Sequence, residues 1–314
     1  MIRVVRYTTK DHDAWNRFNS EAKNPLFMFD RNYMDYHSDR FKDHSLMIYD
    51  EDKLIALLPM NEKENVLYSH GGLTYGGFIT DNNMKQHTML ECVRALKEYA
   101  RLQGIKKIVY KAIPHIYHLQ PAEEDQFALF YHGAKLSTVD SSTFIDLQNP
   151  IKMPKGRKAQ ISRAKREGIV TEEKTLLDDF KTFIDMENEI LTSKHGIKAA
   201  HTADELFLLK NRFPDNIHLY AAMRNGEMLA GVVVYEYTNV IHTQYMASNE
   251  EGRTLGGLDL IVSSVMEQYK DSKKWLDFGI SSEHGRIYLN EGLSAQKEGF
   301  GGRTGVYYIW EIDL

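Results

Sequence analysis

A glycine-rich segment from residue 247 to residue 258 has the composition of an anion-binding turn. It reads Ala-Ser-Asn-Glu-Glu-Gly-Arg-Thr-Leu-Gly-Gly-Leu and leads into an apolar helical pattern. The first N–H groups of a helix lack helical partners, and the helix dipole adds positive potential there. Glycine also lets a phosphate approach the backbone closely. The segment predicts either a phosphate site or a plain helix-start turn, and the candidate phosphate ligands are Arg253, Thr254, Leu255, Gly256, Gly257 and Leu258.

Acidic and phenolic side chains around the last strands of the chain are candidates for proton transfer. Asp277 interrupts an apolar strand pattern, where a carboxylate must be paired or hydrogen-bonded to be tolerated. Glu283 and His284 follow that strand at the end where α/β sheets commonly place their sites. We name Tyr245, Asp277 and Glu283 as candidate catalytic residues, with structural hydrogen bonding as the alternative role of Asp277.

The expected strand 240–248 has two faces. Strict alternation places Ile241, Thr243, Tyr245 and Ala247 on one face and His242, Gln244 and Met246 on the other. The pattern therefore predicts that either Tyr245 or His242 lines a site, but not both.

Candidate substrate contacts lie mainly in the first half of the chain. The stretch His70-Gly-Gly-Leu-Thr-Tyr75-Gly-Gly indicates backbone close to a ligand or, alternatively, a bulged strand. A strand-like run ends near Lys111, and a cationic turn near the end of the chain carries Arg303. The predicted substrate-binding residues are His70, Tyr75, Lys111, His115, Tyr117 and Arg303.

The chain repeats itself. Residues 105–113 resemble residues 272–280, because each is a short apolar strand opened by a Lys-Lys pair and preceded by an amphipathic helix. Each half then has a glycine turn and a final strand ending Ile-Asp-Leu. We predict two mixed-sheet α/β domains, 1–148 and 168–314.

The join between the halves, residues 149–167, is strongly basic. It contains seven Lys or Arg residues and one acid, Glu167, and we expect a helix from Lys158 to Arg166. The segment is either a solvated surface or a contact for a phosphorylated substrate or tRNA.

Composition narrows the class of protein. The net charge of −5 gives no general attraction to DNA, and 42% hydrophobic residues provide for two cores. The single cysteine, Cys92, excludes an internal disulfide and falls in a helical pattern, where we expect it to be core. No run approaches the ~20 apolar residues of a membrane span, and we expect a cytoplasmic protein. No P-loop, serine-hydrolase elbow, zinc-protease motif or other metal cluster is evident.

Taken together, the sequence resembles the GNAT acyltransferase superfamily. Arg253-Thr-Leu-Gly256-Gly-Leu258 resembles its Arg/Gln-x-x-Gly-x-Gly/Ala loop, which cradles the pyrophosphate of coenzyme A, although Leu258 replaces a small residue. The tandem halves, the basic join and Leu276-Asp277-Phe-Gly279 resemble the Fem-like branch. The resemblance implies two tandem GNAT-like domains, with residues 1–148 on the acceptor side and residues 168–314 on the donor side. It also implies acetyl-CoA or another acyl-CoA as donor, and N–H groups near Met246 and Ala247 that hold the acyl carbonyl.

The implied activity is transfer of an acyl group, most simply acetyl, to the amine of a small molecule or a peptidoglycan precursor. One alternative is Fem-type transfer from aminoacyl-tRNA, in which tRNA would be a partner. A second alternative is a non-catalytic binding protein with a degenerate cofactor loop, which Leu258 favours.

Overall fold

The computed structural model describes residues 1–283 and 287–314, apart from the side chains of residues 194 and 195. The chain divides into two compact units. Unit 1 comprises Met1–Asp140 and Val306–Leu314, and unit 2 comprises Ser141–Gly305. The tandem mixed α/β fold predicted from the internal repeat is confirmed.

Unit 1 holds two groups of strands and their covering helices. One group has the order β1-β2-β3-β6, and the other has the order β4-β5-β7-β16 with β5 and β7 parallel. Apolar side chains of α3 and of both groups share one core, which includes the buried Cys92. The elements are β1 (Ile2–Arg6), α1 (His12–Glu21), α2 (Arg31–Met34), β2 (Leu46–Asp50), β3 (Lys53–Leu58), β4 (Asn61–Lys63), β5 (Val66–Ser69), β6 (Ile79–Thr80), α3 (Gln86–Leu102), β7 (Lys107–Lys111), α4 (Glu124–Tyr131) and β8 (Lys135–Asp146).

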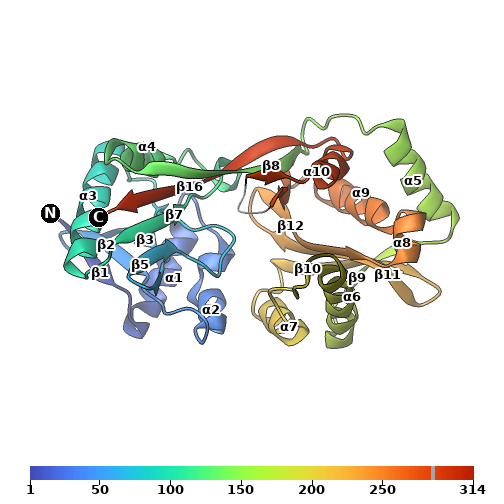
Figure 1. Cartoon of the computed structure of the whole chain (residues 1–314), viewed down its shortest axis with the longest axis horizontal. Helices are drawn as coiled ribbons and strands as arrows, with labels where there is room; N and C mark the ends of the chain where they lie inside the picture. The colour runs from blue at the N-terminus through green and yellow to red at the C-terminus, as the bar shows by residue number, and fades with distance from the viewer. Residues whose placement is uncertain (284–286) are drawn as a thin grey trace. The chain divides into compact units, whose positions relative to one another are not determined.

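Unit 2 contains a sheet of order β8-β13-β12-β11-β10-β9, in which β12 and β13 are parallel and the other described pairs are antiparallel. Helices α6 and α7 lie on one face and α9 on the other (Figure 1). The elements are α5 (Lys155–Arg166), β9 (Val170–Lys174), α6 (Leu177–His195), α7 (Ala203–Arg212), β10 (Ile217–Arg224), β11 (Glu227–Glu236), β12 (Val240–Ser248), α8 (Glu250–Leu255), α9 (Gly257–Tyr269), β13 (Trp275–Ile280), β14 (Ser282–Glu283), β15 (Tyr288–Leu289), α10 (Glu291–Glu298) and β16 (Arg303–Asp313).

The final strands of the two halves are exchanged relative to the domain boundaries expected from sequence. The end of β8 pairs with β13 of unit 2, and β16 pairs with β7 of unit 1. The apolar side chains follow, because Ile145 and Leu147 fill the core of unit 2 while Ile312 fills that of unit 1. Similar strand endings in the repeat give no indication of which sheet each strand completes.

Candidate active site

The parallel strands β12 and β13 separate within unit 2. Their described pairing runs from Val240 and Trp275 to His242 and Asp277 and stops there. Beyond that point β12 continues along β11 to Ser248, and Lys297 Nζ holds β13 by donating to the carbonyls of Gly279 and Ile280 at 2.9 and 2.7 Å. We call the diverging segments, Thr243–Ser248 and Phe278–Ile280, the fork.

A buried acid–imidazole pair lies where the fork opens. Asp277 is 0% exposed, and its Oδ2 lies 2.9 Å from Nδ1 of His242. The other oxygen, Oδ1, accepts from Ser142 Oγ at 3.0 Å and from the Gly279 N–H at 2.8 Å. With Nδ1 donating to the carboxylate, Nε2 of His242 is the basic nitrogen. A buried imidazole oriented in this way has the chemistry of a proton acceptor.

Tyr245 lies on the same face of β12 as His242, so the strict alternation that places the two residues on opposite faces is wrong. Tyr245 is opposite Val233 while Thr243 is opposite Val234, which leaves Gln244 as the extra residue of a β-bulge. A bulge inserts one residue and reverses the alternation beyond it. The Tyr245 hydroxyl is hydrogen-bonded to Nδ1 of His201, a buried residue just before α7.

Glu283, the third candidate catalytic residue, lies in the short β14–β15 hairpin. Its Oε1 accepts from Nδ2 of Asn290 at 2.7 Å. His284, proposed beside it, lies outside the described residues.

The predicted phosphate turn is more helical than its glycines indicate. Arg253, Thr254 and Leu255 belong to α8, and α9 begins at Gly257. The N–H of Arg253 donates to Asn249 O and that of Gly256 to Gly252 O, so these two backbone donors are already used. Helix α5 also packs here, since a Cβ on Gly256 would lie 2.9 Å from the carbonyl of Gln160.

Other predicted cofactor residues are divided between the faces of the sheet. Ala247 is buried opposite Gly231, on the face covered by α6, whereas Met246 and Leu258 pack against the core on the α9 side. Asp259 in the first turn of α9 pairs with Arg157 of α5. The start of α9 is therefore partly covered by the basic helix that joins the two halves.

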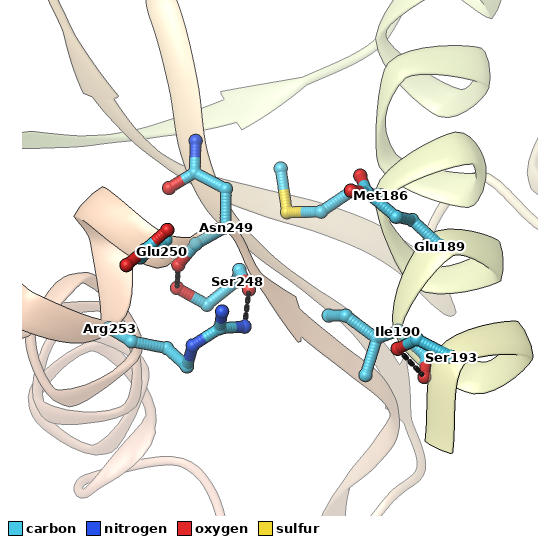
Figure 2. A pocket seen from close by; sticks show the side chains of 8 residues that line it. All are labelled: Met186, Glu189, Ile190, Ser193, Ser248, Asn249, Glu250 and Arg253. Atoms are coloured by element: carbon cyan, nitrogen blue, oxygen red, sulfur yellow. Dashed lines mark hydrogen bonds between the residues drawn. The ribbon is translucent and has the colours of Figure 1, made fainter. Parts of the chain in front are cut away.

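A cavity of about 400 Å³ lies between α6 and the end of β12 (Figure 2). The exposed Arg253 lies at its edge and donates through Nη1 to the carbonyl of Ser248 at 2.8 Å. Glu189 and Glu250 also line it. This mixed lining offers one cation for an anionic group and two carboxylates for a cationic one.

The predicted substrate residues of the first half lie in unit 1 and are mostly buried. The Tyr75 hydroxyl contacts those of Tyr117 and Tyr307 at 2.6 and 3.0 Å. His70 is 2% exposed, and Lys111 Nζ donates to the carbonyl of Leu73. These contacts hold the glycine-rich stretch in place. His115 is exposed in unit 1, and Arg303 is exposed in unit 2, where it donates to Gly302 O.

The buried polar residues of unit 2 that sequence reasoning missed include Ser142, Glu187, His201 and Lys297. Burial lowers the pKa of Lys297 to about 8, although Asp277 partly offsets this effect. Glu187 was detectable, because it extends the apolar stripe of Phe180, Phe183 and Ile184 along one face of a helix. Ser142 and His201 come from segments distant in sequence, so only the fold brings them to Asp277 and Tyr245.

Neither a metal centre nor a membrane span is indicated. Across residues 1–283 and 287–314 no three or more His, Cys, Asp or Glu side chains gather as metal ligands would. The described helices are also too short or too polar to cross a bilayer.

The chain has a GNAT-superfamily, Fem-like fold. Residues 155–285, which include the fork, match the acetyltransferase (GNAT) domain family. Proteins with this domain generally transfer acyl groups from acyl-CoA. A search of curated protein sequences gave no match.

Three solved structures are similar over nearly the whole chain. FemX aligns with a TM-score of 0.70 at 10% identity, covering 99% of this chain and 97% of that one. The L-PGS of Bacillus licheniformis aligns with a TM-score of 0.65 at 14% identity, covering 97% and 92%. A tandem GNAT protein from the clavulanic acid biosynthesis pathway aligns with a TM-score of 0.57 at 11% identity, covering 100% and 98%.

Proposed function

We propose that the protein is an N-acyltransferase that moves an acyl group, most simply acetyl from acetyl-CoA, to an amine at the fork of unit 2. The observation that carries this proposal is the buried His242–Asp277 pair where β12 and β13 diverge. The proposed acceptor is the amine of a small molecule or of a peptidoglycan precursor, as the resemblance to the Fem-like branch implies.

The proposed reaction is direct transfer. The amine nitrogen attacks the acyl carbonyl, and a C–N bond forms as the C–S bond of the thioester breaks. His242 Nε2 takes a proton from the nitrogen while Asp277 stabilises the imidazolium that forms. Tyr245, held by His201, gives a proton to the leaving sulfur. Backbone N–H groups near Met246 and Ala247 hold the carbonyl oxygen as negative charge develops on it.

Arg253 supports an anionic donor. Because the N–H groups of Arg253 and Gly256 are used within the chain, we propose that the donor's phosphates contact the Arg253 side chain at the edge of the cavity.

Glu283, in the β14–β15 hairpin, remains a proposed proton-transfer residue.

Calorimetry with acetyl-CoA tests the donor. We expect micromolar binding by the native protein, binding at least ~10-fold weaker by Arg253→Ala, in line with one lost charged contact, and unchanged binding by Arg101→Ala. Arg101 is exposed on α3 in unit 1, which makes it a matched control. Failure to bind acetyl-CoA or any longer acyl-CoA would refute the acyl-CoA proposal.

The packing of α5 favours a second candidate, Fem-type transfer from aminoacyl-tRNA. Helix α5 covers part of the glycine turn and exposes Lys155, Lys158, Lys165 and Arg166. A polyanion contacts such a basic helix through its phosphates. This candidate would be established if the protein transfers an aminoacyl group from tRNA at a rate that falls steeply with salt concentration, and if it does not bind acyl-CoA.

A further inference from the structure

Glu187 is a buried carboxylic acid without a hydrogen-bond donor in unit 2. The residue is 8% exposed, and its Oε2 has no hydrogen-bond partner among the described residues. A buried oxygen without a donor costs free energy, so its presence in a folded protein requires an explanation. Burial raises the pKa of the Glu187 carboxyl to about 7.

The position of Glu187 directs it at the face of the sheet that carries the fork residues. Glu187 is one turn beyond Phe183, whose ring packs against Gly231 of β11. Gly231 pairs with Ala247 of β12, and Ala247 shares its face with Tyr245 and His242. The carboxyl is therefore enclosed between α6 and the strands on which the proposed reaction takes place.

Strand β12, against which α6 packs, carries a second buried acceptor without a donor. Gln244, the bulged residue of β12, has a buried Oε1 without a partner in the described part of the chain. Two acceptors that both lack donors fit a ligand rich in N–H groups, and an ammonium group carries three. The cavity offers an approach, because Met186, one residue before Glu187, and Ile190, three residues after it, line the cavity from α6.

We propose that Glu187 binds the acceptor as an ammonium ion and takes its first proton. This inference rests on the proposed amine acyltransfer. The ionised Glu187 carboxylate accepts one proton from R-NH₃⁺, which yields a neutral carboxylic acid and a free amine. The amine then attacks the acyl group, and His242 receives the second proton. Without the first transfer, an amine with a pKa near 10 is almost entirely charged at neutral pH and cannot attack.

The other titratable groups near α6 lie on the neighbouring strands and helices or on the exposed side of α6. Strand β12 presents His242 and Tyr245, β11 presents Tyr235, and His201 lies before α7. On α6 itself, Asp185 and Glu189 are exposed. Helix α7 packs Phe207 against Phe180, and the carboxylate of its Glu205 accepts from the N–H of Thr202 at the helix start.

The first experiment measures binding of n-butylamine by calorimetry at pH 8 to the native protein and to Glu187→Gln. Asp185→Asn, on the exposed side of the same helix, is the control, and 1-butanol is the uncharged probe. We expect butylammonium to bind the native protein and the control at least ~10-fold more tightly than Glu187→Gln, since a charged contact is lost. Butanol should bind all three alike. Equal butylammonium affinity in the native protein and Glu187→Gln would overturn the proposal.

The second experiment separates this inference from the proposed function. With an acceptor amine in hand, we expect kcat/KM of Glu187→Gln at pH 7 to fall ~10-fold or more and to recover toward pH 9.5, where the free amine is abundant. Glu187→Asp should restore part of the loss. An unchanged pH profile would refute the role of Glu187 while leaving acyltransfer intact. Conversely, Glu187-dependent amine binding in a protein without transferase activity would refute the function and retain the amine site.

Discussion

Asp277 and His242 show how a residue conspicuous in sequence acquires a chemical role. A carboxylate inside an apolar strand requires partners, and those of Asp277 include His242, Ser142 and the Gly279 N–H. Two of these contacts are structural and one orients an imidazole. The catalytic and structural interpretations are therefore compatible, because the bonds that satisfy the buried carboxylate also hold His242 in place.

The burial of Glu187 should make the free energy of unfolding depend on pH. Its folded pKa of about 7 exceeds the usual 4.5, so its contribution to stability is complete below pH 4.5 and is lost as pH rises through 7. We expect Glu187→Gln to be more stable than the native protein by about 2–3 kcal/mol at pH 9, with little difference at pH 4.5. Urea denaturation at the two pH values measures this. A variant less stable at pH 9 would indicate a structural hydrogen bond instead.

At the scale of elements, two short irregularities determine what unit 2 presents. The bulge at Gln244 turns Tyr245 to the face of His242. Helix α8 occupies part of the expected phosphate turn, and α5 packs against that turn. The bulge therefore determines which β12 side chains share a face with His242, and α8 uses backbone donors that a phosphate turn would leave free.

The packing of α5 against the glycine turn can be measured with two alanine substitutions. Gly256 and Gly226 share a backbone φ of +83°, which costs an alanine about 1–2 kcal/mol. A Cβ at Gly256 also meets the Gln160 carbonyl, whereas a Cβ at Gly226 meets nothing within 4 Å. We therefore expect Gly256→Ala to lose about 2–4 kcal/mol of unfolding free energy and Gly226→Ala about 1–2. Equal losses in chemical denaturation would mean that α5 does not press on the turn.

At the scale of the whole molecule, the two compact units do not coincide with the two halves of the sequence, because the final strands are exchanged. Strand β16 supplies the neighbour of β7 from Ile309 to Asp313, and Ile312 enters the core of unit 1. A fragment cut at the repeat boundary leaves an edge of β7 unpaired and a gap in that core.

Two fragments test this dependence. We expect residues 1–148 alone to lack a cooperative unfolding transition, and residues 1–140 joined to 303–314 by a Gly/Ser linker to regain one. The restored strand buries Ile312, which contributes about 2–3 kcal/mol, together with its ladder hydrogen bonds. Circular dichroism melts and amide exchange in β7 are the measurements. Equally cooperative melting of both fragments would contradict the exchange.

Local patterns in the sequence were sufficient for several elements and for the tandem architecture. They predicted amphipathic helices where α3 and α9 lie, a helix from Lys158 to Arg166 within α5, and a strand over residues 240–248 that is β12 with the observed ends. The sequence also predicted that Cys92 is buried and that Asp277 needs polar partners. Both predictions depend only on the local sequence pattern and on the cost of burying a charge.

Only the tertiary structure decided which strands complete which sheet and which polar groups meet. The partnership of Ser142 with Asp277, of His201 with Tyr245, and of α5 with Gly256 joins segments far apart in the chain. The bulge at Gln244 depends on how β12 pairs with β11, and the alternating pattern of one strand carries no information about that pairing. Such contacts depend on packing between elements, whereas sequence periodicity records only which side of an element is buried.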